Sequence, residues 1–331
     1  NFFNGNPDQL SPFDPNDVNI QANFYYFDET SGQWSPNSVN IFGFYYEEFT
    51  DSGTDWHNEN TTHDFRIRYT PRIQGRWKCS IKVFINSVET YKPNDFVFDV
   101  VPSNLKDFTR VGVNKRYFKI GDEPFFPVGQ NLPWPGTGSG NYSPIPEDDM
   151  AEFHKYHSDM SDLANGGANY FRFLLNPWSI GVEFEKLGHY EDRMYLGWEM
   201  DRILNHARDL GLRIHFNLQV HYPFERVTPT SALHWDWSAN NSGAYPNCTN
   251  FPDDLGYCYS TELGLLTPQE FLDNQAAIGY YKQRLRYIIS RWGYSPDISV
   301  LELFSEANNI GNHANLVYDP NGGGCALVGS N

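Results

Sequence analysis

The 331-residue sequence predicts a multidomain protein. An all-β, Ig-like sandwich is expected to precede an α/β domain of the (β/α)8 TIM-barrel class, with about the first half of the barrel present. Two patterns support this prediction. Short aromatic and β-branched runs, separated by turn-forming residues, fill residues 1–103, which is typical of a sandwich. From residue 121 onward, strand-like runs alternate with long amphipathic segments, which is typical of βα units on a parallel sheet.

The sandwich prediction for residues 1–103 rests on period-two alternation. Phe65, Ile67 and Tyr69 alternate with polar or charged neighbours, and a second alternating run begins at Trp77. Cys79 lies within that second run, so we expect its thiol to be buried among apolar side chains. The runs that we assign to strands are 23–27, 39–46, 65–70, 77–85 and 95–101.

Residues 104–120 are predicted to connect the sandwich to the barrel region, residues 121–331. Apolar residues at helical spacing predict three helices in that region, and glycines mark the ends of the first two. The third helix is expected to begin at a capping box that runs from Thr267 to Glu270. The predicted strands are 124–131, 169–175, 213–220 and 298–304, and the predicted helices are 147–165, 193–210 and 267–292.

Four strands are half of the number that a closed barrel requires. A free half-barrel would leave strand edges unpaired, and unpaired edges promote aggregation. We therefore expect the remaining strands to come from residues beyond the given sequence. The glycine-rich segment 321–331 is expected to be a loop.

The composition disfavours several classes of function. A formal net charge of −17 makes nucleic acid a poor partner, and no apolar run is long enough to span a membrane. No cofactor is expected, because the sequence lacks GxGxxG, P-loop and HExxH motifs, and no metal site is indicated. Cys248 and Cys258 lie in one loop-like stretch, and a local disulfide is preferred over two free thiols. A disulfide implies an oxidising, secreted or cell-surface location.

Polar and aromatic residues follow the predicted ends of all four barrel strands. Because chemistry in a (β/α) barrel takes place at the carboxyl ends of the strands, we expect these residues to converge. Glu306 is the candidate catalytic carboxylate, and Arg172 is placed to hold a partner carboxylate in its ionised form. The remaining candidates, which suit binding of a sugar, are Asn131, Trp134, Trp178, His221, Tyr222, Ser305 and Asn308.

Three segments resemble secreted bacterial glycoside hydrolases of clan A, which are cellulase-like TIM barrels with an N-terminal sandwich. RYFKIGDEPFFPVGQNLPW resembles the junction of the two domains, and GANYFRFLL resembles the second strand, where Arg172 matches an arginine that supports the site. RLRYIISRWGYSPDISVLELFSEAN resembles the helix and fourth strand that end in an Asn–Glu pair. The resemblance covers residues 115–309 well and the sandwich more loosely.

The resemblance implies hydrolysis of a poly- or oligosaccharide by a retaining two-carboxylate mechanism, with Glu306 as the acid/base. It places the nucleophile on a seventh strand, outside the given sequence. Ser305 departs from the clan pattern, since the clan has an asparagine there that bonds the sugar 2-hydroxyl and a serine is shorter.

Two other hypotheses stay open. The chain can be a catalytically inactive surface protein that binds glycans or serves as a subunit of a cell-envelope complex, with Glu306 as a structural carboxylate. Alternatively, residues 1–103 can act as a carbohydrate-binding module.

Overall fold

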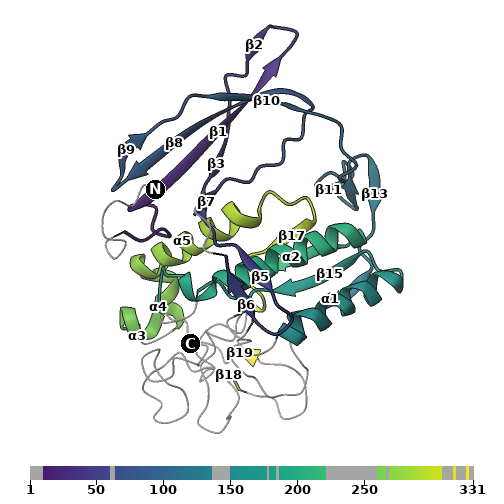
Figure 1. Cartoon of the computed structure of the whole chain (residues 1–331). Helices are drawn as coiled ribbons and strands as arrows, with labels where there is room; N and C mark the ends of the chain where they lie inside the picture. Colours follow the sequence, from purple (N-terminus) through teal and green to yellow (C-terminus); the bar gives the residue numbers. More distant parts are fainter. Residues whose placement is uncertain are drawn as a thin grey trace.

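The computed structural model describes residues 10–59, 64–135, 150–176, 179–183, 186–220, 259–265 and 268–307, and the backbone of 316–317 and 326–327. Figure 1 shows the long antiparallel strands of the N-terminal part above the helices and the parallel sheet of the C-terminal part. We refer to these two parts as the β region (described residues 10–101) and the α/β region (described residues 129–307).

Two long antiparallel strands, β1 (Val18–Asp28) and β8 (Gly75–Ile85), form the centre of a six-stranded sheet in the β region. Cys79 on β8 is 1% exposed, and burial raises the pKa of its thiol to about 11, so the predicted buried thiol is confirmed. The core of this sheet consists of Ala22, Phe24, Trp77 and Cys79. The outer strands are β2 (Gln33–Trp34), β3 (Val39–Phe42), β9 (Val88–Tyr91) and β10 (Phe96–Val100).

Two short ribbons complete the described strands of the β region. They pair β4 (Phe44–Tyr45) with β7 (Phe65–Arg66), and β5 (Phe49–Asp51) with β6 (Trp56–Asn58). The strand predicted over 65–70 therefore ends at Arg66. Ile67 and Tyr69 still pack against the core of the six-stranded sheet, so their alternation reflects burial of an extended segment without ladder pairing. The β-rich character of this region is confirmed.

The predicted connecting segment contains regular structure. β11 (Thr109–Val111), β12 (Phe118–Ile120) and β13 (Glu123–Phe125) form a three-stranded antiparallel sheet. The run 124–131, predicted as one strand, is therefore divided between two sheets. Pro127 lies at the division, where its missing N–H prevents a ladder hydrogen bond.

The α/β region contains the four parallel strands that the sequence predicts, in the same order as in the chain. β14 (Gly129–Asn131), β15 (Tyr170–Leu174), β16 (Arg213–Asn217) and β17 (Ile298–Glu302) are successive neighbours, and every pair is parallel. Their carboxyl ends therefore meet at one edge of the sheet.

Helices α1 (Met150–Asn165) and α2 (Met194–Leu210) match their predicted positions, and Gly211 ends α2 with φ +71°. The prediction of one continuous helix over 267–292 is wrong. This segment is divided into α4 (Pro268–Asp273) and α5 (Gln275–Trp292), because the Asn274 side chain accepts hydrogen bonds from two N–H groups in the first turn of α5.

The short elements are η3 (Glu191–Arg193), α3 (Tyr259–Leu263), β18 (Leu316–Val317) and β19 (Ala326–Leu327). β19, which pairs with β18, lies inside the segment 321–331 that was expected to be loop.

The two faces of the parallel sheet differ in chemistry. One face is apolar, and its residues belong to the large core that includes residues of the three long helices: Phe171, Phe173, Ile214 and Phe216. The alternate positions carry Arg172, His215 and Glu302, so the opposite face is polar. No helix in the described part of the chain is long and apolar enough to cross a membrane.

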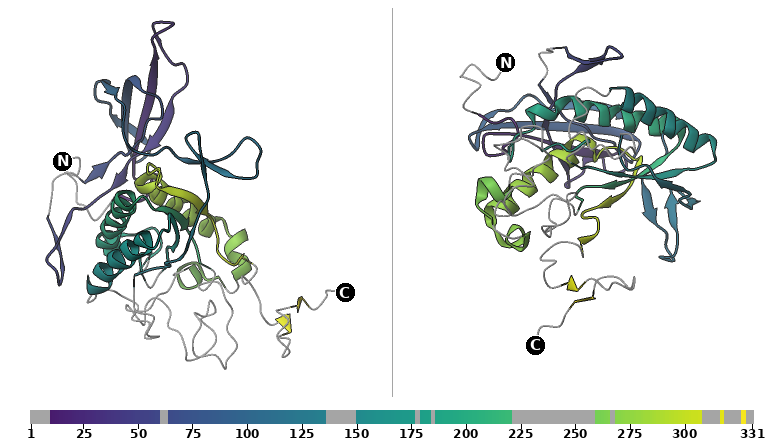
Figure 2. Two further views of the ribbon diagram at one scale, coloured as in Figure 1. Left: turned by 90° about the vertical axis from the view of Figure 1, so that its right-hand side faces the viewer. Right: turned by 90° about the horizontal axis from the view of Figure 1, so that it is seen from below.

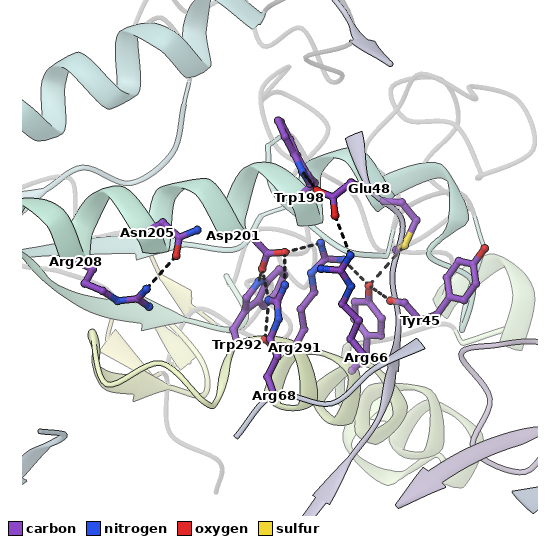
Figure 3. Close-up of polar contacts among 12 residues, drawn as sticks. Tyr45, Glu48, Arg66, Arg68, Trp198, Asp201, Asn205, Arg208, Arg291 and Trp292 are labelled. Carbon is purple, nitrogen blue, oxygen red and sulfur yellow. Dashed lines mark hydrogen bonds and ion pairs between the residues drawn. The ribbon is translucent and has the colours of Figure 1, made fainter. Parts of the chain in front are cut away.

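A buried polar cluster joins the β region to the α/β region (Figure 3). Asp201 on α2 accepts hydrogen bonds from Arg68 of the β region at 2.6 and 3.0 Å, from Arg291 at 3.0 Å and from Trp292 at 2.8 Å. We call these four residues the Asp201 centre. Burial alone would raise the pKa of Asp201, but Arg291 and Arg68 together lower it.

The β5–β6 ribbon makes a second joint on the surface of α1 and α2, as Figures 1 and 2 show. The Trp56 indole N–H donates to Glu199 at 2.7 Å. Asp51 lies 2.7 Å from both the His154 ring and the Arg202 guanidinium. The β region is thus attached to the α/β region at these two places and through further contacts, such as the hydrogen bond from Arg286 to Asn19 at 2.7 Å.

Candidate active site

The candidate site lies at the carboxyl ends of the four parallel strands. Strand register places Asn131, Arg172 and His215 side by side on three neighbouring strands. Register on the last pair places Asn217 opposite Glu302. Since alternate residues share a face, Arg172, His215 and Glu302 all lie on the polar face.

Arg172 and Glu302 form a bidentate ion pair across this face. The Arg172 Nε donates to Glu302 Oε2 at 2.9 Å, and Nη2 donates to Oε1 and Oε2 at 2.9 and 2.7 Å. Nη2 also donates to the Ser305 hydroxyl at 2.7 Å. Two parallel donor groups fix the orientation of a carboxylate more strictly than a lysine could. We call Arg172, His215, Glu302 and Ser305 the Glu302 centre.

His215 completes this centre. Its Nε2 lies 3.1 Å from Glu302 Oε2. Burial lowers the pKa of His215, the Arg172 guanidinium lowers it further, and Glu302 acts in the opposite direction. The ring is therefore neutral near pH 7.

Glu306 follows the Glu302 centre in a strained turn. Its φ is +53°, in the left-handed region that residues other than glycine seldom occupy, and its side chain is exposed. The preceding Ser305 is 2% exposed, and its N–H donates to the Gln219 carbonyl at 2.8 Å. Such conformations persist only where the surroundings impose them, and they are concentrated at functional sites.

Two asparagines at the same edge have buried polar atoms that lack a hydrogen-bond partner. Asn176, just after β15, has both amide atoms unpaired, and Asn217, the last residue of β16, has its Oδ1 unpaired. Both residues are 0% exposed. Buried polar groups usually have a partner, so a polar ligand or ordered water at this edge could supply one to both asparagines.

The structure brings together part of the predicted site. Arg172, Ser305 and Glu306 lie at one place, Asn131 is exposed beside Arg172, and Trp134 is half-buried just after β14. The other predicted residues lie outside the described part of the chain: Trp178, His221, Tyr222, Asn308 and the cysteines Cys248 and Cys258.

Sequence analysis missed Glu302 and His215. The carboxylate held by Arg172 comes from the same strand end as Glu306, four residues earlier. A signal was present, because a charged residue within a buried strand needs a partner. Once the strands are aligned, Arg172, His215 and Glu302 all lie on the same face of the sheet. Among the described residues, no group of three or more His, Cys, Asp or Glu side chains could hold a metal ion.

Comparison with known proteins finds similarity to solved structures at low sequence identity. No protein-family model matches the sequence, and no curated protein matches it. Among solved structures, a proposed glycoside hydrolase from Bacteroides vulgatus is 13% identical with a TM-score of 0.46, over 89% of this chain and 52% of that one. The β-D-mannosidase of Dictyoglomus thermophilum is 10% identical with a TM-score of 0.25, over 86% of this chain and 25% of that one.

The chain thus spans about half of the first of these structures and a quarter of the second. At these TM-scores, neither similarity defines the activity of this chain.

Proposed function

We propose that the chain is part of a secreted or cell-surface glycoside hydrolase that acts on a poly- or oligosaccharide, with Glu306 as the acid/base. The observation that supports this most is the placement of Glu306. It is an exposed carboxylate in a left-handed turn at the carboxyl edge of a parallel sheet, directly after the Glu302 centre. A general acid there would protonate the glycosidic oxygen as the bond to the leaving sugar breaks.

In a retaining mechanism a second carboxylate attacks the anomeric carbon, and water then releases the sugar, with Glu306 acting as the base. The two carboxyl groups must lie about 5–5.5 Å apart. Glu302 is poorly suited to be the nucleophile, because both of its oxygens accept hydrogen bonds from Arg172. We assign the nucleophile to a strand outside the 331 residues.

This proposal includes a closed barrel. β14 and β17 are the edges of the parallel sheet in the described part of the chain. Leu301 on β17 is 45% exposed, and Val128 beside β14 is 58% exposed. Further parallel strands paired with both edges would cover these residues and would enclose the polar face as the barrel interior.

The test is hydrolysis of a panel of polysaccharides and aryl glycosides by the full-length protein and its Glu306→Gln variant. We expect the wild type to cleave one substrate and the variant to lose roughly 100-fold or more of kcat, as for a lost general acid. Glu123→Gln, an exposed glutamate on β13, is the matched control and should keep full activity. Proton NMR of the first product must show the retained anomer, and an inverted anomer would overturn the retaining mechanism.

One observation favours a second function, binding of glycans without hydrolysis. The Ser305 hydroxyl accepts a hydrogen bond from Arg172, and Ser305 is buried, so it is not poised to bond a sugar hydroxyl as the clan's asparagine does. This hypothesis is supported if the panel shows binding to one glycan, equal for wild type and Glu306→Gln, and cleavage of none.

A further inference from the structure

We propose that Tyr281 and Arg284 on α5 are positioning residues that hold the turn of Glu306 in its left-handed conformation. This inference rests on the proposed function, since it concerns the placement of the acid/base. Tyr281 and Arg284 are three residues apart and so lie on the same face of the helix. The Arg284 guanidinium lies over the Tyr281 ring, 4.9 Å from its centroid.

Tyr281 acts on the turn directly. Its hydroxyl donates to the backbone carbonyl of Leu303 at 3.2 Å. Phe304, the next residue, packs against the small apolar cluster that also includes Tyr281. The chain is therefore held at 303 and 304, just before the residue with φ +53°.

Arg284 acts through Gln219. Its Nη2 donates to the side-chain oxygen of Gln219, and both residues are almost fully buried. The backbone carbonyl of Gln219 accepts the N–H of Ser305 at 2.8 Å. Arg284 thus fixes Gln219, and the Gln219 carbonyl in turn holds the N–H of Ser305 in the turn.

The buried charge of Arg284 is balanced away from the turn. Glu183 lies 3.5 Å from Arg284 and accepts hydrogen bonds from the Gly188 N–H at 3.0 Å and the Tyr259 hydroxyl at 3.2 Å. Burial raises the pKa of Glu183, and Arg284 opposes this effect. Glu183 supplies the countercharge of Arg284. The hydrogen bond from Arg284 to the neutral Gln219 therefore contributes to the position of the turn and not to charge balance.

A left-handed residue other than glycine is unfavourable, so it needs contacts that exclude the ordinary conformation. Tyr281 and Gln219 supply such contacts from two directions. Loss of either should let the turn relax and should move the Glu306 carboxylate from its place. A displacement of about 1 Å in an active site can lower the rate roughly 100-fold.

The first experiment compares Tyr281→Phe with Tyr280→Phe in the full-length protein, on the substrate found with the panel. Both variants lose one hydroxyl from the same helix, and both tyrosines pack against the same small apolar cluster, but it is the Tyr281 hydroxyl that bonds to Leu303. We expect kcat of Tyr281→Phe to fall roughly 10- to 100-fold with KM unchanged, and Tyr280→Phe to match the wild type.

A mutant cycle separates positioning from general damage. If Tyr281 acts through Glu306, then Tyr281→Phe causes no further loss in the Glu306→Gln background. An equal loss in both backgrounds would overturn the inference, as would wild-type kcat in Tyr281→Phe. Wild-type activity of Glu306→Gln would instead contradict the proposed function.

Arg284 is tested with the charge-matched double variant Glu183→Gln/Arg284→Met, because Arg284→Met alone leaves Glu183 buried and unpaired. The double variant should lose kcat as Tyr281→Phe does, and it should cause no further loss in the Glu306→Gln background. Wild-type kcat in the double variant, or an equal loss in both backgrounds, would show that Arg284 does not position the turn.

Discussion

The molecule has two arginine–carboxylate centres that use the same chemistry in different surroundings. In the Asp201 centre, two arginines and an indole N–H surround one carboxylate, with Arg291 0% exposed. In the Glu302 centre, one arginine holds one carboxylate, and both side chains are 24% exposed. The first centre joins the β region to the α/β region, and the second lies at the carboxyl edge of the parallel sheet.

The difference indicates what each centre is suited to do. All groups around Asp201 belong to the fold, with Arg291 and Trp292 0% exposed and the Arg68 side chain 18% exposed, so the centre supports stability and relative placement of the two regions. The Glu302 centre is reachable from solvent and adjoins a strained turn with an exposed carboxylate. Accessible, oriented charges of this kind are what ligand binding requires.

The largest expected effect is from Asp201→Asn, which leaves the buried Arg291 and the partly buried Arg68 without this countercharge. We expect the free energy of unfolding to fall by about 3–5 kcal/mol, measured by denaturant titration. Asp209→Asn, an exposed aspartate on the same helix, is the control and should change it by less than about 0.5 kcal/mol. A similar small change in both variants would remove the distinction between the two centres.

A steric test of the Asp201 centre uses Gly197 on α2. A Cβ there would lie 2.7 Å from Nη1 and 2.8 Å from Cζ of Arg291, which is buried. Gly197→Ala should therefore lower the free energy of unfolding by about 1–3 kcal/mol, despite the better helix propensity of alanine.

The matched change is Gly279→Ala on α5, where a Cβ would meet nothing within 4 Å. It should raise the free energy of unfolding by about 0.5–1 kcal/mol. Stabilisation by both alanines would show that Arg291 does not pack as closely against α2 as the structure has it.

Glu302→Gln should affect activity far more than stability. The pair is partly exposed, so its loss should lower the free energy of unfolding by about 1 kcal/mol. Activity should fall roughly 10-fold or more, because Arg172 would lose the partner that orients it beside Ser305. Stability loss as large as that of Asp201→Asn, with full activity, would assign the Glu302 centre to the fold alone.

The smallest effect concerns acid pH and the β5–β6 ribbon. Hydrogen bonds from His154 and Arg202 lower the pKa of Asp51 from 3.8 to about 2, although partial burial opposes them. A depressed folded-state pKa means that the stabilisation is present above about pH 4 and is lost as the pH falls toward 2. Asp51→Asn should therefore be less stable than wild type at pH 5, and the difference should vanish near pH 2. A difference that is constant with pH would show that Asp51 contributes without its charge.

Much of the architecture was predictable from the sequence. The four parallel strands followed from alternation of strand-like and helical patterns, and Gly211 ends α2 because glycine tolerates a positive φ. The division of the third helix was not predictable in the same way, because the apolar spacing continues across Asn274. Only the side-chain cap at Asn274 shows where α5 begins.

The sequence by itself determined the types of strand and helix, the burial of Cys79 and the position of Glu306 after the fourth parallel strand. Periodicity and turn chemistry act over a few residues, so a single sequence reveals them. Tertiary structure decided the partner of Arg172, which is Glu302, 130 residues later in the chain. It also decided that Arg68 and Arg291 both bind Asp201. Strand register and helix packing set these pairs, and such long-range placement leaves no local pattern in a sequence.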